Sequence, residues 1–372
     1  MPEPALSYLA SARFEAARSV ACVADGHPCR RLHGHSFLCR LRARPPAAWV
    51  PYPGGALPTL AACLQRATAE LDYRFLNELL AYPTDEELAR WLWRRLTRQG
   101  VAERSVHGLL GVGIASTAEQ GVELLALDRA RVWRRFHFAA AHRLPRVPAG
   151  HPCGRLHGHS FAVTLIAEAG FPDQAPLALD YELLAEAWEP IGRQLAHRCL
   201  NEVPGLDNPT SEVLAAWLWE RLRPALGALR ALRVAETCTA GCHYDGQRHV
   251  IWKEFRAESA VRLPAAPNGS ELARWHGHSY RLRCCLAPPF DAMLGWTIDF
   301  RAVKDGLQAA IAELDHHALN ELPGIADGDP ASVARWLWDA ARARFGEGPL
   351  VALVVEEEPG HGAVLGDAVE PW

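Results

Sequence analysis

The chain has 372 residues, of which 49% are hydrophobic, and its formal net charge is −4. At about 100–200 residues per domain, this length predicts two or three domains. The slightly acidic balance, with a sequence pI of about 6.5, and the lack of a basic tract argue against a protein built mainly to hold nucleic acid.

Targeting signals are not evident in the sequence. The first residues contain neither a basic region nor a sustained apolar run, so no signal peptide is expected. Nowhere do about 18 apolar residues follow one another, so no membrane span is expected. The ten cysteines are scattered, which is typical of thiols in a cytosolic protein and not of a disulfide framework. We therefore expect a cytoplasmic protein with no membrane or nucleic-acid partner.

Three short motifs recur in constant order along the chain. His-Gly-His begins at residues 33, 157 and 276, and Leu-Asn-Glu begins at 76, 200 and 319, in both cases 124 and 119 residues apart. Trp-Leu-Trp begins at 91, 217 and 336, with offsets of 126 and 119. Such self-similarity indicates a triplicated domain. The predicted units are residues 1–128, 129–249 and 250–372.

The middle unit shows the local structure most clearly. In chain order it is predicted to contain two strands, two helices and two strands, at residues 132–144, 159–169, 181–195, 211–226, 229–237 and 243–251. Phe161 and Val163 alternate to one face of a strand, whereas Leu184 and Trp188 have helical spacing. Pro190 is expected to kink the first helix.

The first unit adds a helix-start signal, because Thr84 and Glu87 have the spacing of a capping box. Each unit is therefore an α+β domain of ββααββ order. A four-stranded antiparallel sheet leaves two edges unpaired, and closure into a ring removes them. Three copies in one chain are compatible with a pseudo-trimeric, twelve-stranded antiparallel β-barrel with helices outside.

The second unit carries a candidate metal site. His157 and His159 lie two apart, so on a strand they share one face, and His142 on the neighbouring strand is the natural third ligand. Three protein ligands and one open position suit catalytic zinc. The corresponding residues in the other units are Arg18, which has no lone pair to donate, and Ser259, a poor substitute for imidazole. We expect one zinc ion per chain.

At this point the residues resemble a known family. The segments FAAAHRL, CGRLHGHS, NPTSE and VAET resemble the 6-pyruvoyltetrahydropterin synthase and 6-carboxytetrahydropterin synthase family, over the second unit and more weakly over the other two. The Cys-x3-His-Gly-His spacing resembles the carboxy-forming enzymes of queuosine and deazapurine synthesis. The resemblance implies the tunnelling fold, a covalent pseudo-trimer, and a homodimer of two stacked barrels.

Residue roles follow from the resemblance. It implies that His142, His157 and His159 bind Zn²⁺, that Cys153 is the general base, and that Glu236 anchors the pterin. In the third unit Glu356 aligns with Glu236, and in the first unit Ser116 stands there.

The family also has an adjacent Asp-His relay, which a neighbouring subunit supplies. The first unit has Asp72 but Tyr73, and the second has His197 preceded by alanine. Asp315 and His316 occur together in the third unit alone. We hypothesise a composite site in which the third unit brings Asp315 and His316 to Cys153, with His197 as a further catalytic candidate.

The predicted activity is that of a zinc-dependent carbon-carbon and carbon-oxygen lyase. The expected substrate is 7,8-dihydroneopterin triphosphate, which would lose triphosphate and acetaldehyde. Three alternatives stay open: a 6-pyruvoyltetrahydropterin synthase, a non-catalytic pterin- or purine-binding protein on the same scaffold, and a different zinc lyase or cyclohydrolase acting on a related heterocycle. Four arginines alternate away from the apolar face of their strands, and they are either solvated or line the barrel channel. These are Arg40, Arg42, Arg281 and Arg283.

Overall fold

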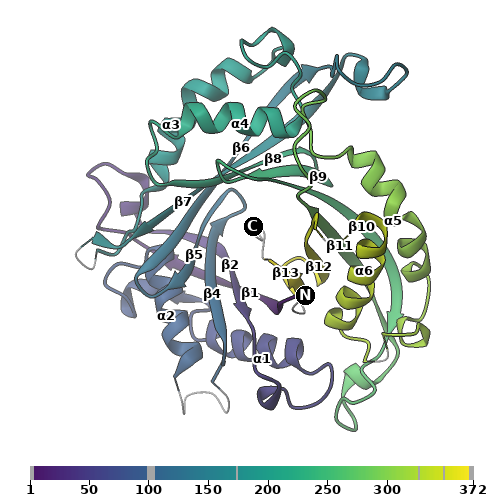
Figure 1. Ribbon diagram of the computed structural model, residues 1–372. Coiled ribbons are helices and arrows are strands. Elements are labelled where there is room, and N and C mark those ends of the chain that lie inside the picture. Colours follow the sequence, from purple (N-terminus) through teal and green to yellow (C-terminus); the bar gives the residue numbers. More distant parts are fainter. Residues whose placement is uncertain (1–3, 99–104, 173–174, 326, 347, 368–372) are drawn as a thin grey trace.

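The strands of the computed structural model close into a single barrel. The structure describes residues 4–98, 105–172, 175–325, 327–346 and 348–367. Within them, twelve antiparallel strands follow one another in ladder order, and the last strand pairs with the first. Figure 1 shows the strands as a ring with the helices outside it. The predicted twelve-stranded barrel is confirmed.

The three repeats have the same element order. The first contains β1 (Leu6–Arg18), β2 (His33–Ala43), α1 (Ala56–Thr68), α2 (Asp85–Thr97), β4 (Leu109–Thr117) and β5 (Gln120–Ala126). The second contains β6 (Arg129–His142), β7 (His157–Gly170), α3 (Tyr181–Leu195), α4 (Ser211–Leu222), β8 (Leu229–Thr237) and β9 (Ala240–Tyr244). The third contains β10 (His249–Val261), β11 (His276–Leu286), α5 (Phe300–Leu314), α6 (Pro330–Phe345), β12 (Leu350–Glu358) and β13 (His361–Gly366). A two-residue strand, β3 (Arg74–Phe75), pairs in parallel with β1.

Two details of the second repeat differ from the sequence prediction. The strand expected at 243–251 is in fact the end of β9, a turn at residues 245–248 and the start of β10. Gly246 has a φ of 91° there, and the Asp245 side chain accepts hydrogen bonds from the N–H groups of Gln247 and Arg248, two and three residues further on. Helix α3 runs without a break through Pro190.

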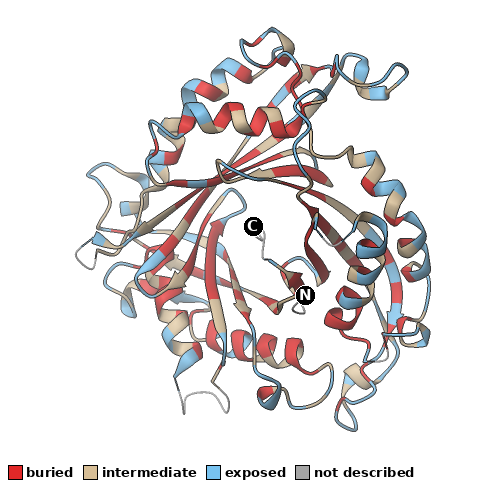
Figure 2. Ribbon diagram, viewed as in Figure 1, coloured by how far each residue is buried: buried red, intermediate tan, exposed pale blue. Residues whose placement is uncertain are grey.

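The main core lies between the barrel wall and the helices. On β7, Phe161, Val163 and Leu165 are buried and pack in one cluster with Leu184 of α3 and Leu218 of α4. Full burial of such a side chain stabilises the fold by about 1.5–3 kcal/mol. Figure 2 shows the helix faces toward the strands as buried and the outer faces as exposed. Intervening strand residues point into the barrel, because side chains alternate along a strand.

None of the described helices combines the length and apolar character that a transmembrane segment requires.

Side-chain hydrogen bonds join neighbouring repeats beyond the strand ladder. Thr84 caps α2, since its hydroxyl accepts from the Glu87 N–H at 3.1 Å. The other half of the predicted capping box is absent, because the Thr84 N–H donates to the Tyr82 carbonyl. The Thr84 hydroxyl also donates to the Pro176 carbonyl of the second repeat at 2.7 Å. One buried side chain therefore fixes a helix start and a repeat interface together.

Replacing this residue tests that interface. We expect Thr84→Ala to lower the free energy of unfolding by about 1–2 kcal/mol, because a cap and a buried hydrogen bond are lost together. Urea unfolding followed by circular dichroism measures the change. Thr97→Ala, on the exposed end of the same helix, is the control. Equal losses in both variants would contradict this assignment.

Candidate metal and proton-transfer site

Three histidines meet where β6 and β7 pair at one rim of the barrel. His142 lies opposite His157 in the strand register, and His159 lies opposite Ala140. The ring centroids of His142 and His157 are 4.6 Å apart, and those of His157 and His159 are 5.0 Å apart. One ligand atom from each of the three rings, and one from Glu236, all lie within 4.8 Å of one another.

Backbone carbonyls orient two of these rings. Nδ1 of His142 is 2.9 Å from the Pro209 carbonyl, and Nδ1 of His157 is 2.8 Å from the Arg155 carbonyl. When Nδ1 donates to a carbonyl, Nε2 carries the free lone pair that a metal needs. Nε2 of His142 is buried without a hydrogen-bond partner in the described part of the chain. Burial lowers the pKa of His142, which favours the neutral, metal-binding ring. These residues fit a divalent metal ion.

Glu236 on β8 adjoins the histidine cluster. Its Oε1 is 3.1 Å from Nε2 of His159 and 3.7 Å from Nε2 of His142, and its Oε2 accepts from the Ser211 hydroxyl at 2.8 Å. Burial raises the pKa of this carboxyl, but the hydrogen bond from His159, the charge of His142 and the Ser211 hydroxyl outweigh burial and hold it below its usual range. A charged carboxylate here can accept from a ligand N–H or join a metal.

Cys153 lies in a one-turn 3-10 helix (Pro152–Gly154) between β6 and β7. Its backbone N–H donates to Nδ1 of His151 at 3.2 Å. Burial raises the pKa of the Cys153 thiol, and the negative charges of Glu236 and Asp299 raise it further. The thiolate that proton abstraction requires therefore depends on a positive charge beside it.

A second Asp-His pair, which the sequence reasoning missed, holds this cysteine turn. Nε2 of His151 is 3.0 Å from Oδ2 of Asp299, the residue that caps α5 of the third repeat. Because Nδ1 of His151 accepts from Cys153, Nε2 carries the proton and donates to Asp299. The aspartate directly before the helical run at 300–314 was a visible capping signal, but the sequence did not show which histidine it meets.

The same segment of the third repeat lies against the second repeat beside the site. Asn208 donates to the Leu294 carbonyl at 2.7 Å. The Thr297 N–H donates to the carboxylate of Glu212 at 2.8 Å. Residues 291–299 are thus the part of the third repeat that adjoins the histidine cluster.

Asp315 and His316 lie at the opposite end of α5. This helix has 15 residues, a length of about 22 Å. Oδ1 of Asp315 accepts from the Glu258 N–H at 2.8 Å, and the His316 N–H donates to the Glu258 carbonyl at 2.7 Å. In the described chain neither residue contacts Cys153.

His197 occupies the corresponding exposed position in the second repeat, where its N–H donates to the Ala139 carbonyl at 2.7 Å. Tyr73, His197 and His316 all have left-handed φ values, of 52°, 58° and 58°. Such backbone is costly for residues other than glycine and is concentrated at functional sites.

In the first repeat an ion pair replaces the metal site. Nη1 of Arg18, at the position of His142, is 2.7 Å from Oδ1 of Asp85, and both side chains are buried. The other oxygen of Asp85 accepts from Ser116 at 2.8 Å and from Tyr181 at 2.8 Å. The guanidinium closes this cluster, although His33 and His35 are retained.

In the third repeat the predicted counterpart of Glu236 was wrong by one residue. The strand register pairs Ala162 with Ala235 and, equivalently, Arg281 with Glu356. Glu357 is therefore the counterpart of Glu236, and its Oε1 is 3.9 Å from Nε2 of His278. A shift of one residue moves a side chain to the other face of a strand, so Glu356 points into the barrel.

Comparison with known proteins gives the family. The 6-pyruvoyl tetrahydropterin synthase family matches the chain three times, over residues 9–124, 131–247 and 250–367. The chain belongs to this family, in three tandem copies, and the predicted resemblance and lyase class are confirmed. It is a pterin lyase of the tunnelling-fold type.

Individual relatives match one copy at a time. A 6-carboxy-5,6,7,8-tetrahydropterin synthase of Synechocystis is 34% identical over 125 residues, which cover 32% of this chain and 94% of the relative. A dihydroneopterin monophosphate aldolase of Pyrococcus furiosus is 32% identical over 98 residues, or 26% of this chain and 79% of the relative. A solved 6-pyruvoyl tetrahydropterin synthase of Caenorhabditis elegans has 21% identity and a TM-score of 0.30, and the match covers 32% of this chain and 96% of that one.

The ion pair of the first repeat can be tested through stability. We expect Arg18→Ala to lower the free energy of unfolding by about 3–5 kcal/mol, because Asp85 keeps a buried charge without its cation. Urea unfolding measures the loss. Arg301→Ala removes the exposed pair with Asp305 and should cost less than about 1 kcal/mol. Similar small losses in both variants would contradict a structural role for Arg18.

Proposed function

We propose that the chain is a zinc-dependent, 6-carboxytetrahydropterin synthase-like lyase of queuosine and deazapurine biosynthesis, acting in the cytoplasm. It would convert 7,8-dihydroneopterin triphosphate to a 6-substituted tetrahydropterin with loss of triphosphate and acetaldehyde. One observation carries the proposal: the second repeat places a cysteine and a charged glutamate beside three histidines that can bind a metal ion. The Synechocystis relative, which bears this enzyme name, supports it.

Each side chain has a defined part in this proposal. His142, His157 and His159 would hold the ion, since three neutral imidazoles suit zinc and leave a position open. Bound zinc would act as a Lewis acid that makes the hydroxyls and adjacent C–H groups of the substrate side chain more acidic. Cys153 would take and return protons. Glu236 would accept hydrogen bonds from pterin N–H donors. We assign this work to residues 129–249.

The Asp315–His316 relay would then come from a second copy of the chain. The pair is separated from the His151 end of α5 by the length of that helix, yet it lies at the same rim of the barrel as the histidine clusters. Three apolar side chains directly precede the His-Gly-His motifs on this rim and are exposed: Leu32 by 70%, Leu156 by 65% and Trp275 by 50%. Exposed apolar groups that recur around a rim favour a protein contact. Two barrels stacked through this rim would form the homodimer, with residues 250–372 supplying the relay and residues 1–128 completing the barrel.

Turnover with a defined product tests the activity. We expect the zinc-loaded chain to release acetaldehyde and triphosphate from 7,8-dihydroneopterin triphosphate, as followed by mass spectrometry. His157→Ala should lose both bound zinc and turnover, whereas the matched His33→Ala in the first repeat should keep both. Cys153→Ala should lower kcat about 100-fold or more with zinc retained, and Cys29→Ala should not.

Other products would identify the alternatives. A pyruvoylpterin would assign the chain to the pyruvoyl-forming reaction. Zinc binding and pterin binding without any product would assign it to a non-catalytic pterin-binding protein. Full turnover by Cys153→Ala would overturn the role of that thiol.

Complementation tests the origin of the relay. Cys153→Ala and His316→Ala homodimers should each be nearly inactive with zinc retained. Chains that are mixed, unfolded and refolded together should regain about one quarter of wild-type activity. Half of the random dimers would then pair one intact Cys153 with one intact His316. Activity in the His316→Ala homodimer, or no recovery on mixing, would contradict a relay between chains.

A further inference from the structure

The interior of the barrel contains a charged cavity on the side of the wall opposite to the helices. Its volume is about 470 Å³, and strands of all three repeats line it. Five arginines and two glutamates of the described chain contribute to its wall. They are Arg40, Arg135, Arg233, Arg281, Arg283, Glu254 and Glu356. This settles the alternative that the sequence left open for three of these arginines: they line the channel.

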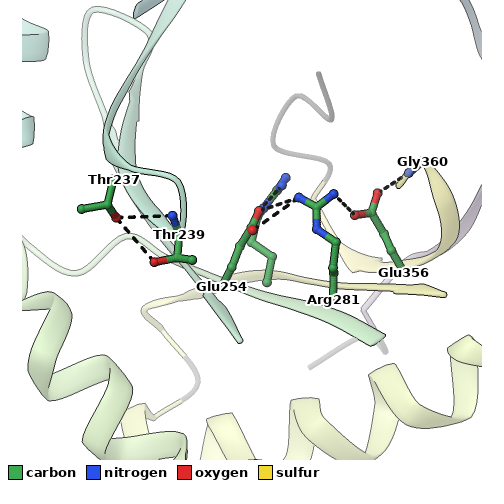
Figure 3. Close-up of polar contacts among 7 residues, drawn as sticks. Thr237, Thr239, Glu254, Arg281, Glu356 and Gly360 are labelled. Carbon is green, nitrogen blue, oxygen red and sulfur yellow. Dashed lines mark hydrogen bonds and ion pairs between the residues drawn. The ribbon is translucent and has the colours of Figure 1, made fainter. Parts of the chain in front are cut away.

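The two carboxylates account for part of the positive charge. Glu254 accepts from Nε of Arg283 at 3.0 Å and from Nη2 of Arg281 at 3.3 Å. Oε2 of Glu356 is 3.7 Å from Arg281, and its other oxygen accepts from the Gly360 N–H at 2.8 Å. Figure 3 shows Glu254, Arg281 and Glu356 in a row, with Gly360 beyond. Five guanidinium groups against two carboxylates leave three positive charges in excess.

Burial and the neighbouring positive charges lower the pKa values of two of these arginines. Burial, and after it the charges of Arg283 and Arg135, lower the pKa of Arg233 to about 9. Burial likewise lowers the pKa of Arg40 to about 10; Glu356 opposes this shift, and the neighbouring arginines add to it. Arg135 donates to two uncharged acceptors, the Thr164 hydroxyl and the Ala118 carbonyl, each at 3.4 Å. Like charges held together away from water repel strongly unless an anion joins them.

Trp252 also lines this wall. Its side chain is 4% exposed, and Nε1 has no hydrogen-bond partner in the described residues. The guanidinium groups of Arg233 and Arg283 each lie 5.4 Å from its ring centroid, a distance that allows cation–π attraction. The indole ring thus places its apolar face, and not a charge, between two of the arginines of this wall.

The cluster follows the threefold repeat only in part: Arg40 and Arg283 occupy equivalent positions of the first and third repeats, where the second has Thr164. By strand register, Arg233 corresponds to Gly113 in the first repeat and Val354 in the third. Arg281 corresponds to Leu38 and Ala162 in the same way. The lumen therefore carries one arrangement of charges per chain. Three identical copies could not build this arrangement, because every charged residue would then occur three times.

We propose that this cavity is a binding site for a compact phosphate polyanion of the diphosphate or triphosphate class. Planar guanidinium groups bind phosphate oxygens with paired, charge-assisted hydrogen bonds, and three excess charges match such an anion. The site lies on the inner face of the barrel wall, whereas the histidine cluster lies on the outer face, because Ser160 of the cavity and His159 are adjacent and alternate along β7. Its ligand has two sources, the triphosphate released by the proposed reaction or free diphosphate.

Calorimetric titration of the full chain with inorganic triphosphate, diphosphate and monophosphate tests this proposal. We expect one triphosphate per chain. Arg135→Gln and Arg233→Gln should each weaken binding at least tenfold. The matched control is Arg134→Gln, which changes the residue directly before Arg135 on β6. Arg134 bonds to the Tyr181 carbonyl outside the barrel, so this variant should bind as the wild type does. His142→Ala should also bind triphosphate as the wild type does, because it alters only the candidate metal site.

The outcomes separate the possibilities. Tighter binding of triphosphate than of diphosphate supports the site with the released product as ligand, and equal binding supports it with free diphosphate. Absence of binding, binding unchanged in both cavity variants, or binding lost in His142→Ala would each overturn the proposal. Thermal melting confirms that the variants fold, and Arg233→Lys replaces Arg233→Gln if the latter does not.

Discussion

The pairing of β13 with β1 is the interaction on which the rest of the molecule depends. Four residue pairs, from Leu6 with Leu365 to Leu9 with Gly362, join the two ends of the chain. Without them the sheet would have two open edges, and open edges invite pairing with other chains. Closure also fixes each repeat against its neighbour. The loop before α5 therefore reaches the cysteine turn of the second repeat, and strands from all three repeats face one lumen.

Covalent linkage changes what closure costs. Separate subunits must give up translational and rotational freedom to form such a ring, whereas tethered copies close it within one chain. Linkage also releases the copies from identity. Arg18 stands in one repeat, His142 in the next and Ser259 in the third, and each position is buried in its own environment. The asymmetric wall of the lumen is possible for the same reason.

Much of this architecture could be predicted from the sequence. The repeats were visible because three motifs keep their spacing, and the histidine cluster was visible because strand alternation places His157 and His159 on one face. Contacts between distant segments were not visible. His151 and Asp299 are 148 residues apart and meet only when the second and third repeats pack against each other. The wrong assignment of Glu356 had another cause. Three glutamates are adjacent in Val-Val-Glu-Glu-Glu, and only the strand register shows which one lies on the same face as His278.

The ion pair between Arg18 and Asp85 has an evolutionary consequence. A single change from arginine to histidine would restore the third imidazole of the first repeat, but it would leave Asp85 buried without its guanidinium. Recovery of a working centre there would need at least two coordinated changes, with a less stable chain as the intermediate. The ion pair therefore makes the loss of the metal site in the first repeat difficult to reverse.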